Sequence, residues 1–199
     1  MRANSLLELD HGYPFEVPAV ADGRMTRPVP YKAMGRFRRE AVAVEPRTSI
    51  VYQSEDVDDG CWYRFIPHKY GMLADGGRLQ ALCIVGRAGL DTRNWEHVPD
   101  VPIGAKLPVA WIDMSDVESP NDDLRIRANA AGAAKFCRAE GMWYGHDSVY
   151  FACTTGGRNQ RGQIWRYYPS PLEGAPREVE QPGILELFIE PNDSGMIDN

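Results

Sequence analysis

The sequence lacks several features that would place it in a familiar class. No apolar run approaches the roughly 20 residues that a membrane-spanning helix needs. The N-terminus, "MRANSLLELDHGYP", shows neither the apolar core nor the cleavage site of a signal peptide. With 22 Lys and Arg against 28 Asp and Glu, the net charge is −6, whereas nucleic-acid binders need a basic surface. We therefore expect no membrane span and no nucleic-acid partner.

Motifs of common catalytic and metal sites are also absent. There is no G-x-S-x-G, no H-E-x-x-H and no G-x-G-x-x-G. The four His are scattered, and the cysteines form no C-x-x-C pair and match no zinc spacing. Each cysteine sits among apolar or aromatic neighbours, which favours a buried thiol over a disulfide or a metal ligand. The cysteines are Cys61, Cys83, Cys137 and Cys153.

Short aromatic runs and many turn residues are what the 199-residue chain does contain. It has 9 Tyr, 6 Phe and 5 Trp, together with 19 Gly and 15 Pro. Aromatic residues in short runs between turns favour strands over helices. A hydrophobic content of 43% is enough for a real core in one domain or little more.

One pattern occurs twice, first over residues 40–67 and again over 140–169. Each copy starts with Glu, then has a short apolar segment, a turn, a β-rich run, a polar loop with Gly, and an aromatic strand that closes on Pro. A fourth strand follows each copy, at 78–85 and at 183–191. Four consecutive antiparallel strands, repeated, are typical of β-propeller blades.

We therefore predict an all-β fold in which residues 1–199 form one partial β-propeller domain. It has two complete four-stranded blades, about 40–86 and 140–190, and part of a third at 5–17. Residues 87–139 are an insertion with one short helix within 125–137, N-capped by Asn121 or Asp122. Two blades do not close a ring, so the chain is expected to be a fragment of a longer protein or to assemble with copies of itself.

The first strand of a propeller blade lines the channel, and Glu40 and Glu140 begin these strands. Their carboxylates are expected to converge on the axis, where a hard cation such as Ca²⁺ would neutralise them. Arg38 and Arg138 lie two residues earlier and can hold a phosphate or carboxylate with both nitrogens of the guanidinium. The alternative is an Arg–Glu ion pair that fixes the end of the inner strand.

The loops after the second strands offer further candidates. Residues 55–59 hold four acidic side chains, and Glu55 and Asp56 are nearest the strand end. They can ligate Ca²⁺, or the loop can be an ordinary solvated turn. In the second copy, Gly156 and Gly157 permit close approach to an anion, although a tight hairpin explains them better. The residues alone indicate a carboxylate site with arginines but name no reaction.

Several stretches resemble the PhoX-type bacterial alkaline phosphatase family. They are "MGRFRREAVAVEPRTSIVYQSEDVDDGCWYRFIP", "RAEGMWYGHDSVYFACTTGG", "GQIWRYYP", "DTRNWE" and "ELFIEPNDSGMIDN", and the resemblance as a whole covers nearly the whole chain. The resemblance implies a six-bladed propeller with calcium and iron at one end of its channel. It also implies hydrolysis of phosphate monoesters by exported proteins, periplasmic or secreted.

The family motifs carry over to particular residues. Glu40 and Glu140 match family glutamates that look like metal ligands, and Glu55-Asp56 match a "T-E-D" stretch. Arg138 matches the Arg before "E-G", which makes it the expected catalytic phosphate clamp, with Arg38 as a second substrate-binding arginine. The chain departs from the family in having Arg39 where His is common.

Larger departures concern iron and the remaining blades. The family's upstream Cys-Glu-Glu motif and its downstream blades have no counterpart here, and none of the four cysteines matches the iron-binding one. We therefore expect the isolated chain to be inactive and the intact protein to be a metal-dependent phosphatase. The alternative is a non-catalytic, calcium-stabilised propeller used for binding or scaffolding.

Overall fold

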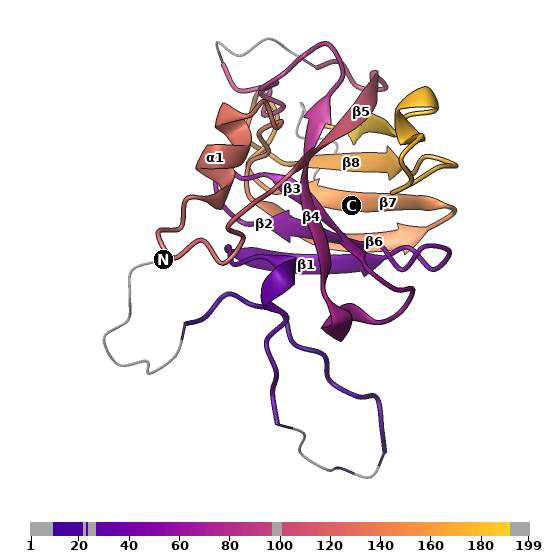
Figure 1. Cartoon of the computed structure of the whole chain (residues 1–199). Coiled ribbons are helices and arrows are strands. Elements are labelled where there is room, and N and C mark those ends of the chain that lie inside the picture. Colours follow the sequence, from indigo (N-terminus) through magenta and orange to yellow (C-terminus); the bar gives the residue numbers. More distant parts are fainter. Residues whose placement is uncertain (1–9, 22, 24–26, 97–100, 192–199) are drawn as a thin grey trace.

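A computed structural model of the chain describes residues 10–21, 23, 27–96 and 101–191. Most of the regular structure in these residues is β-strand, with one short α-helix (Figure 1). The strands are β1 (Arg39–Val44), β2 (Val51–Glu55), β3 (Trp62–Pro67), β4 (Gly77–Ile84), β5 (Lys106–Asp113), β6 (Ala139–Gly145), β7 (Ser148–Cys153), β8 (Gln163–Tyr168) and β9 (Ile184–Ile189). The helices are α1 (Leu124–Ala130) and the 3-10 turns η1 (Lys32–Met34), η2 (Leu73–Asp75) and η3 (Glu178–Glu180). None of the described helices has the length and hydropathy needed to cross a membrane.

The nine strands form one antiparallel sheet in the order β1-β2-β3-β4-β5-β9-β8-β7-β6. Strands β1–β4, the first unit, and strands β6–β9, the second unit, each follow the chain from one neighbour to the next. Strand β5 pairs with the last strand of each unit and so joins them. The predicted all-β fold, with two four-stranded units and one short helix, is confirmed. The division into a single domain with blades at 40–86 and 140–190 stays a prediction.

The insertion at residues 87–139 contains a strand, β5, that the sequence does not predict. Residues 106–113 read "KLPVAWID", and Pro108 cannot donate a ladder hydrogen bond. Strand β5 forms nevertheless, because Pro108 lies opposite Ile184 at the end of the β9 pairing and still accepts a hydrogen bond from the Val85 N–H at 2.9 Å. Tertiary pairing on both sides therefore outweighs the weak local propensity.

Two smaller expectations are wrong. Residues 10–17 contain no strand, only an isolated bridge from Phe15 to Pro30, because Gly12 has a positive φ of 104° and Pro14 follows it; residues 5–9 lie outside the described part. The N-cap of α1 is Asp123, not Asn121 or Asp122. Its carboxylate caps no helix N–H and instead accepts a hydrogen bond from Ser119 at 2.6 Å.

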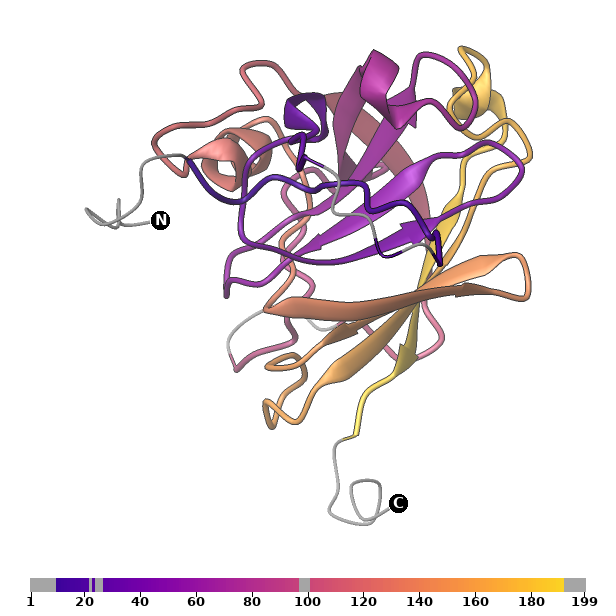
Figure 2. The same ribbon diagram turned by 90° about the horizontal axis from the view of Figure 1, so that it is seen from below.

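The main hydrophobic core lies between the two units, which face each other across it (Figure 2). Side chains alternate across a strand, and the core residues follow this spacing in the second unit, as with Trp165 and Tyr167 on β8 and Leu185 and Leu187 on β9. Trp62 of the first unit stacks between Tyr52, at 5.0 Å between ring centroids, and Phe151 of the second unit, at 4.8 Å. The rings of Trp111 on β5 and Tyr167 on β8 complete the aromatic cluster.

A second core covers the other face of the first unit. Phe37, Tyr63, Phe65 and Leu79 pack there with Leu124, the first residue of α1. Residues of η1 and α1 therefore lie over the first unit, and every residue of β2 is buried. A strand that is buried on both faces reads as a continuous run rather than an alternating one.

The two ends of the sheet, β1 and β6, come into contact with each other. The Ser54 hydroxyl joins them, since its Oγ accepts the Ala41 N–H at 2.9 Å and donates to the Glu140 carbonyl at 2.8 Å. The sheet is therefore bent until its first and last strands nearly close a barrel. This closure brings together the starts of the two strands that carry the predicted glutamates.

Candidate functional site

The loop after β2 lies against the segment that leads into β6. The N–H of Phe136 donates to the Gly60 carbonyl and the N–H of Arg138 donates to the Val57 carbonyl, both at 2.8 Å. Gly60 is required because a Cβ there would lie 2.7 Å from the Glu55 carbonyl oxygen. These contacts fix residues 55–60 of the first unit beside the start of the second.

Arg138 is held between two of the predicted acidic residues. Its Nε lies 2.8 Å from Asp56 Oδ1 and its Nη2 lies 3.2 Å from Asp56 Oδ2, the geometry of a two-pronged ion pair. The same Nη2 lies 3.3 Å from Glu140 Oε1. The three side chains keep exposures of 44% (Arg138), 26% (Asp56) and 29% (Glu140), so an anion or cation in solvent can reach them.

The backbone at Arg138 is unusual. Its φ is 46°, in the left-handed region that residues with a side chain rarely adopt. Such conformations persist where the surrounding structure requires them, often at functional sites. The hydrogen bond with Asp56 raises the pKa of Arg138, so its charge is secure at any physiological pH.

Glu40 occupies the equivalent position on β1 and is exposed. The backbones that follow Glu40 and Glu140 meet at Ser54, as described above. The expectation that the two carboxylates share one cavity stays a prediction, since what the structure establishes is the proximity of the strand starts.

Glu55 and Asp56 have opposite surroundings, because consecutive residues at a strand end point to opposite faces. The Glu55 carboxylate is buried and accepts hydrogen bonds from the Cys61 N–H at 3.1 Å and the Tyr63 hydroxyl at 3.0 Å, both on Oε2. Its Oε1 has no partner among the described residues. Burial raises the pKa of Glu55 to about 7.

The two arginines before Glu40 have different partners. Arg38 is half-exposed and pairs with Asp122 at 3.3 Å. Arg39 is half-buried and donates to Gln53 and to the carbonyls of Gly12, Met34 and Gly35. Burial lowers the pKa of Arg39 to about 10. Arg39 therefore ties the 12–35 segment to β1 and β2.

The described carboxylates do not form a complete metal site. No group of three or more His, Cys, Asp or Glu side chains gathers in the described ranges in a way that can hold a metal ion. Calcium takes 6–8 oxygen ligands, and the Asp56 carboxylate is already bridged by a guanidinium. These residues therefore do not by themselves fit a calcium or iron centre.

The cysteines offer no iron ligand set either. Cys61, Cys137 and Cys153 are buried, Cys83 is half-buried, and all four are free thiols. Burial of the first three agrees with their apolar surroundings in the sequence.

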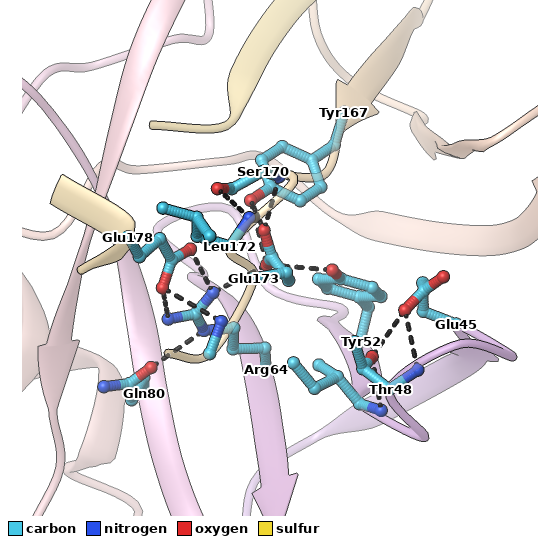
Figure 3. Close-up of polar contacts among 12 residues, drawn as sticks. Glu45, Thr48, Tyr52, Arg64, Gln80, Tyr167, Ser170, Leu172, Glu173 and Glu178 are labelled. Carbon is cyan, nitrogen blue, oxygen red and sulfur yellow. Dashed lines mark hydrogen bonds and ion pairs between the residues drawn. The ribbon is translucent and has the colours of Figure 1, made fainter. Parts of the chain in front are cut away.

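A buried polar cluster between the units is the main feature that was not predicted from the sequence (Figure 3). The Arg64 guanidinium on β3 bonds to Gln80 at 2.8 Å, to Glu173 at 2.6 Å, and to Glu178 at 2.6 and 2.7 Å. The hydroxyls of Tyr52 and Tyr167 donate to the same Glu173. The signal that was available is the Arg repeated in "WYRFIP" and "IWRYYP".

A cavity of about 230 Å³ adjoins this cluster, lined by Arg64, Gln80, Trp111 and Glu178 among others. The guanidinium there is already bound by two carboxylates and an amide. Its contacts hold the 170–180 segment of the second unit to the first unit, so we assign the cluster a structural role.

Comparison with known proteins gives two matches. The family model described as "Alkaline phosphatase PhoX" matches residues 4–193. The solved structure of Pseudomonas fluorescens PhoX in complex with vanadate, a transition state analogue, is 20% identical, with a TM-score of 0.62. The match covers 89% of this chain but 35% of that one, so the chain spans about a third of its length. No curated protein matches. The structural likeness identifies the fold as an incomplete propeller.

Proposed function

The chain belongs to the PhoX alkaline phosphatase family, and we propose on this basis that it supplies part of a site that hydrolyses phosphate monoesters. The observation that carries the proposal is the position of Arg138, whose part-exposed guanidinium lies between Asp56 and Glu140 where β1 and β6 begin. A guanidinium fork is suited to the oxygens of a phosphoryl group.

Arg138 is the proposed phosphate clamp. Without substrate its charge is balanced by Asp56, which keeps the fork in a fixed orientation. A phosphate oxygen pair can replace the Asp56 oxygens, because both present two acceptors at similar spacing. Arg38, at the equivalent position of the first unit, is the proposed second substrate-binding residue.

Glu40, Glu140, Glu55 and Asp56 are the proposed metal ligands, with calcium and iron as the proposed metals. Bound metal would act as a Lewis acid that stabilises charge on the transferring phosphoryl group. Because the described residues do not complete a coordination shell, further ligands, including the cysteine for iron, have to come from elsewhere. The proposed sources of these ligands are the missing blades of a longer chain or a second copy of this chain. The proposed location of the protein is periplasmic or secreted.

An assay with matched variants tests this proposal. The purified chain and the longest natural protein that contains it are incubated with a generic phosphomonoester, with Ca²⁺ and Fe³⁺ or with chelator. We expect background hydrolysis from the chain alone and chelator-sensitive turnover from the longer protein, abolished by Glu140→Gln. Glu118→Gln is the control, since Glu118 pairs with Lys32 away from Arg138.

The result separates the candidates. Chelator-sensitive turnover by the isolated chain would mean that the residues present suffice or that copies assemble into a closed ring. A longer protein that binds Ca²⁺ yet hydrolyses no ester would reject the phosphatase proposal in favour of the binding or scaffolding alternative.

A further inference from the structure

The second unit has an outer face, turned away from the first unit, on which no described helix or strand packs (Figure 2). Four cross-strand neighbours form a row on this face, here called the outer row: Trp143, Tyr150, Arg166 and Glu186. The Phe188 ring adjoins the row, 5.7 Å from that of Tyr150. Trp143 and Phe188 are 75% and 42% exposed. Large apolar side chains that gather on one exposed face mark an interaction surface.

Arg166, in the middle of the outer row, has no acidic partner among the described residues. Its Nε donates to Ser148 Oγ at 3.1 Å, and its guanidinium lies over the Tyr168 ring at 4.2 Å. The neighbouring carboxylate of Glu186 accepts hydrogen bonds from Tyr168 and Lys106 instead. Both terminal nitrogens of Arg166 therefore remain available to an acceptor from outside the described part of the chain.

The equivalent row of the first unit shows what such a row binds. It consists of Ala43, Tyr52, Arg64 and Gln80, and none of the four is more than 6% exposed. The connection between β8 and β9 of the second unit covers it. Glu173 of this connection accepts hydrogen bonds from the Tyr52 hydroxyl at 2.9 Å and from Arg64 at 2.6 Å. The row of one unit thus receives carboxylates from the connection between the last two strands of the next unit.

We propose that the outer row is the docking surface for a further four-stranded unit of the longer protein proposed above. The connection between the last two strands of that unit places a carboxylate on Arg166, which a guanidinium fork binds with two nitrogens. Trp143 and Phe188 supply the apolar contact around this pair. The present chain covers 35% of the matched solved chain, which leaves ample length for such a unit. The proposal shares the longer chain with the proposed function but does not depend on hydrolysis.

A second copy of this chain does not offer the required segment. Its Glu173 and Glu178 are already bound to its own Arg64. Its connection between β3 and β4 has one acidic residue, Asp75, which pairs with Lys69 at 2.8 Å. The face of the first unit that would have to pack on the outer row is covered by residues of η1 and α1. These contacts favour a further unit as the occupant.

Binding of a peptide to the full chain tests the proposal. The probe is a synthetic peptide of residues 169–182, the segment that covers the row of the first unit. At millimolar concentration it should shift the NMR signals of the Arg166 side chain and of the neighbouring residues of β7 and β8. Signals around Arg64 should not move, because the tethered segment keeps that row occupied. The same peptide with Gln in place of its three Glu residues should shift none of these signals.

Two variants sharpen the result. Arg166→Gln should weaken binding of the acidic peptide by roughly tenfold, because a hydrogen-bonded charge pair is lost. Arg87→Gln is the matched control, since Arg87 is an exposed arginine outside the outer row, and it should bind as the wild type does. Absence of a shift at Arg166, equal affinity in Arg166→Gln, or shifts confined to Arg64 would each overturn the proposal. Outer-row signals that change with protein concentration in the absence of peptide would give this face to a second copy and also overturn it.

Discussion

The two four-stranded units place the same repeated arginine in opposite environments. Arg64 in "WYRFIP" and Arg166 in "IWRYYP" each stand three residues before the closing Pro. Arg64 is 2% exposed and bound by two carboxylates. Arg166 is only half-buried, donates to Ser148 Oγ at 3.1 Å, and stacks on Tyr168 at 4.2 Å.

The difference follows from which face has a neighbour. Arg64 shares a cross-strand row with Tyr52 and Gln80, and this row faces the second unit. In the second unit the corresponding row is Tyr150, Arg166 and Glu186. That row lies on the face turned away from the shared core. The repeat therefore encodes a sheet, and the adjoining unit decides whether a given position is buried.

The largest expected effect separates the two arginines. Arg64→Ala leaves Glu173 buried without its cation, and breaking such a pair costs about 3–5 kcal/mol of unfolding free energy. Arg166→Ala removes a part-exposed side chain and should cost less than about 1 kcal/mol. Urea unfolding measures both. Equal losses would show that the neighbouring unit does not create the difference.

The next effect concerns the last residue of the second strand, which is Glu55 in the first unit and Cys153 in the second. Burial raises the folded-state pKa of Glu55 to about 7, above its ordinary 4.5. The folded state therefore holds the Glu55 proton more tightly than the unfolded state does. The resulting contribution to the free energy of unfolding is complete below about pH 4.5 and falls by about 3 kcal/mol as the pH rises to 7.

Glu55→Gln tests this dependence. The variant keeps the shape without the charge, so it should be the more stable protein at pH 8 and lose the slope between pH 5 and 7, measured with chelator present. Glu45→Gln is the control. Although burial opposes it, hydrogen bonds from Thr48 and Arg47 lower the pKa of Glu45, so its titration falls below this window. An unchanged slope in Glu55→Gln would contradict the assignment.

A third comparison sets Arg138 against Arg38, its equivalent in the first unit. Arg138 binds Asp56 with two nitrogens, whereas the Arg38 contact with Asp122 is a single one at 3.3 Å. In the longer protein proposed above, we expect Arg138→Ala to lower kcat/KM by about 10²-fold, as the loss of one anion-stabilising group does. Arg38→Ala should lower it less. The opposite order would move the phosphate clamp to the first unit.

How much of the fold could be predicted from the sequence depends on how far apart in the sequence the interacting residues lie. Residue alternation and turn residues indicate the four strands of each unit, because these are local patterns. Strand β5 could not be predicted, since it is stabilised by pairing with β4 and β9 and not by its own composition.

The site divides in the same way. The repeat placed Arg138 and Glu140 together, but the Asp56 partner lies 82 residues from Arg138, and the Glu173 partner of Arg64 lies 109 residues away. Contacts of this length follow from how the units pack, which the sequence of one unit does not state. Burial of Glu55 beside part-exposed Asp56 likewise depends on the second core over the first unit.

The smallest expected effect concerns the exposed row of the second unit. Trp143 is 75% exposed, and its counterpart on β1, Ala43, which pairs with Tyr52 as Trp143 pairs with Tyr150, is 6% exposed in the core. Trp143→Ser should therefore change the unfolding free energy by no more than about 0.5 kcal/mol, whereas Ala43→Ser, which buries a hydroxyl, should cost about 1–3 kcal/mol. Both are measured by urea unfolding at two protein concentrations. A loss above about 2 kcal/mol for Trp143→Ser, with a midpoint that depends on concentration, would show that a second copy covers this row in solution. The row that contains Ala43 and the row that contains Trp143 would then both be covered, the first by the other unit and the second by another copy of the chain.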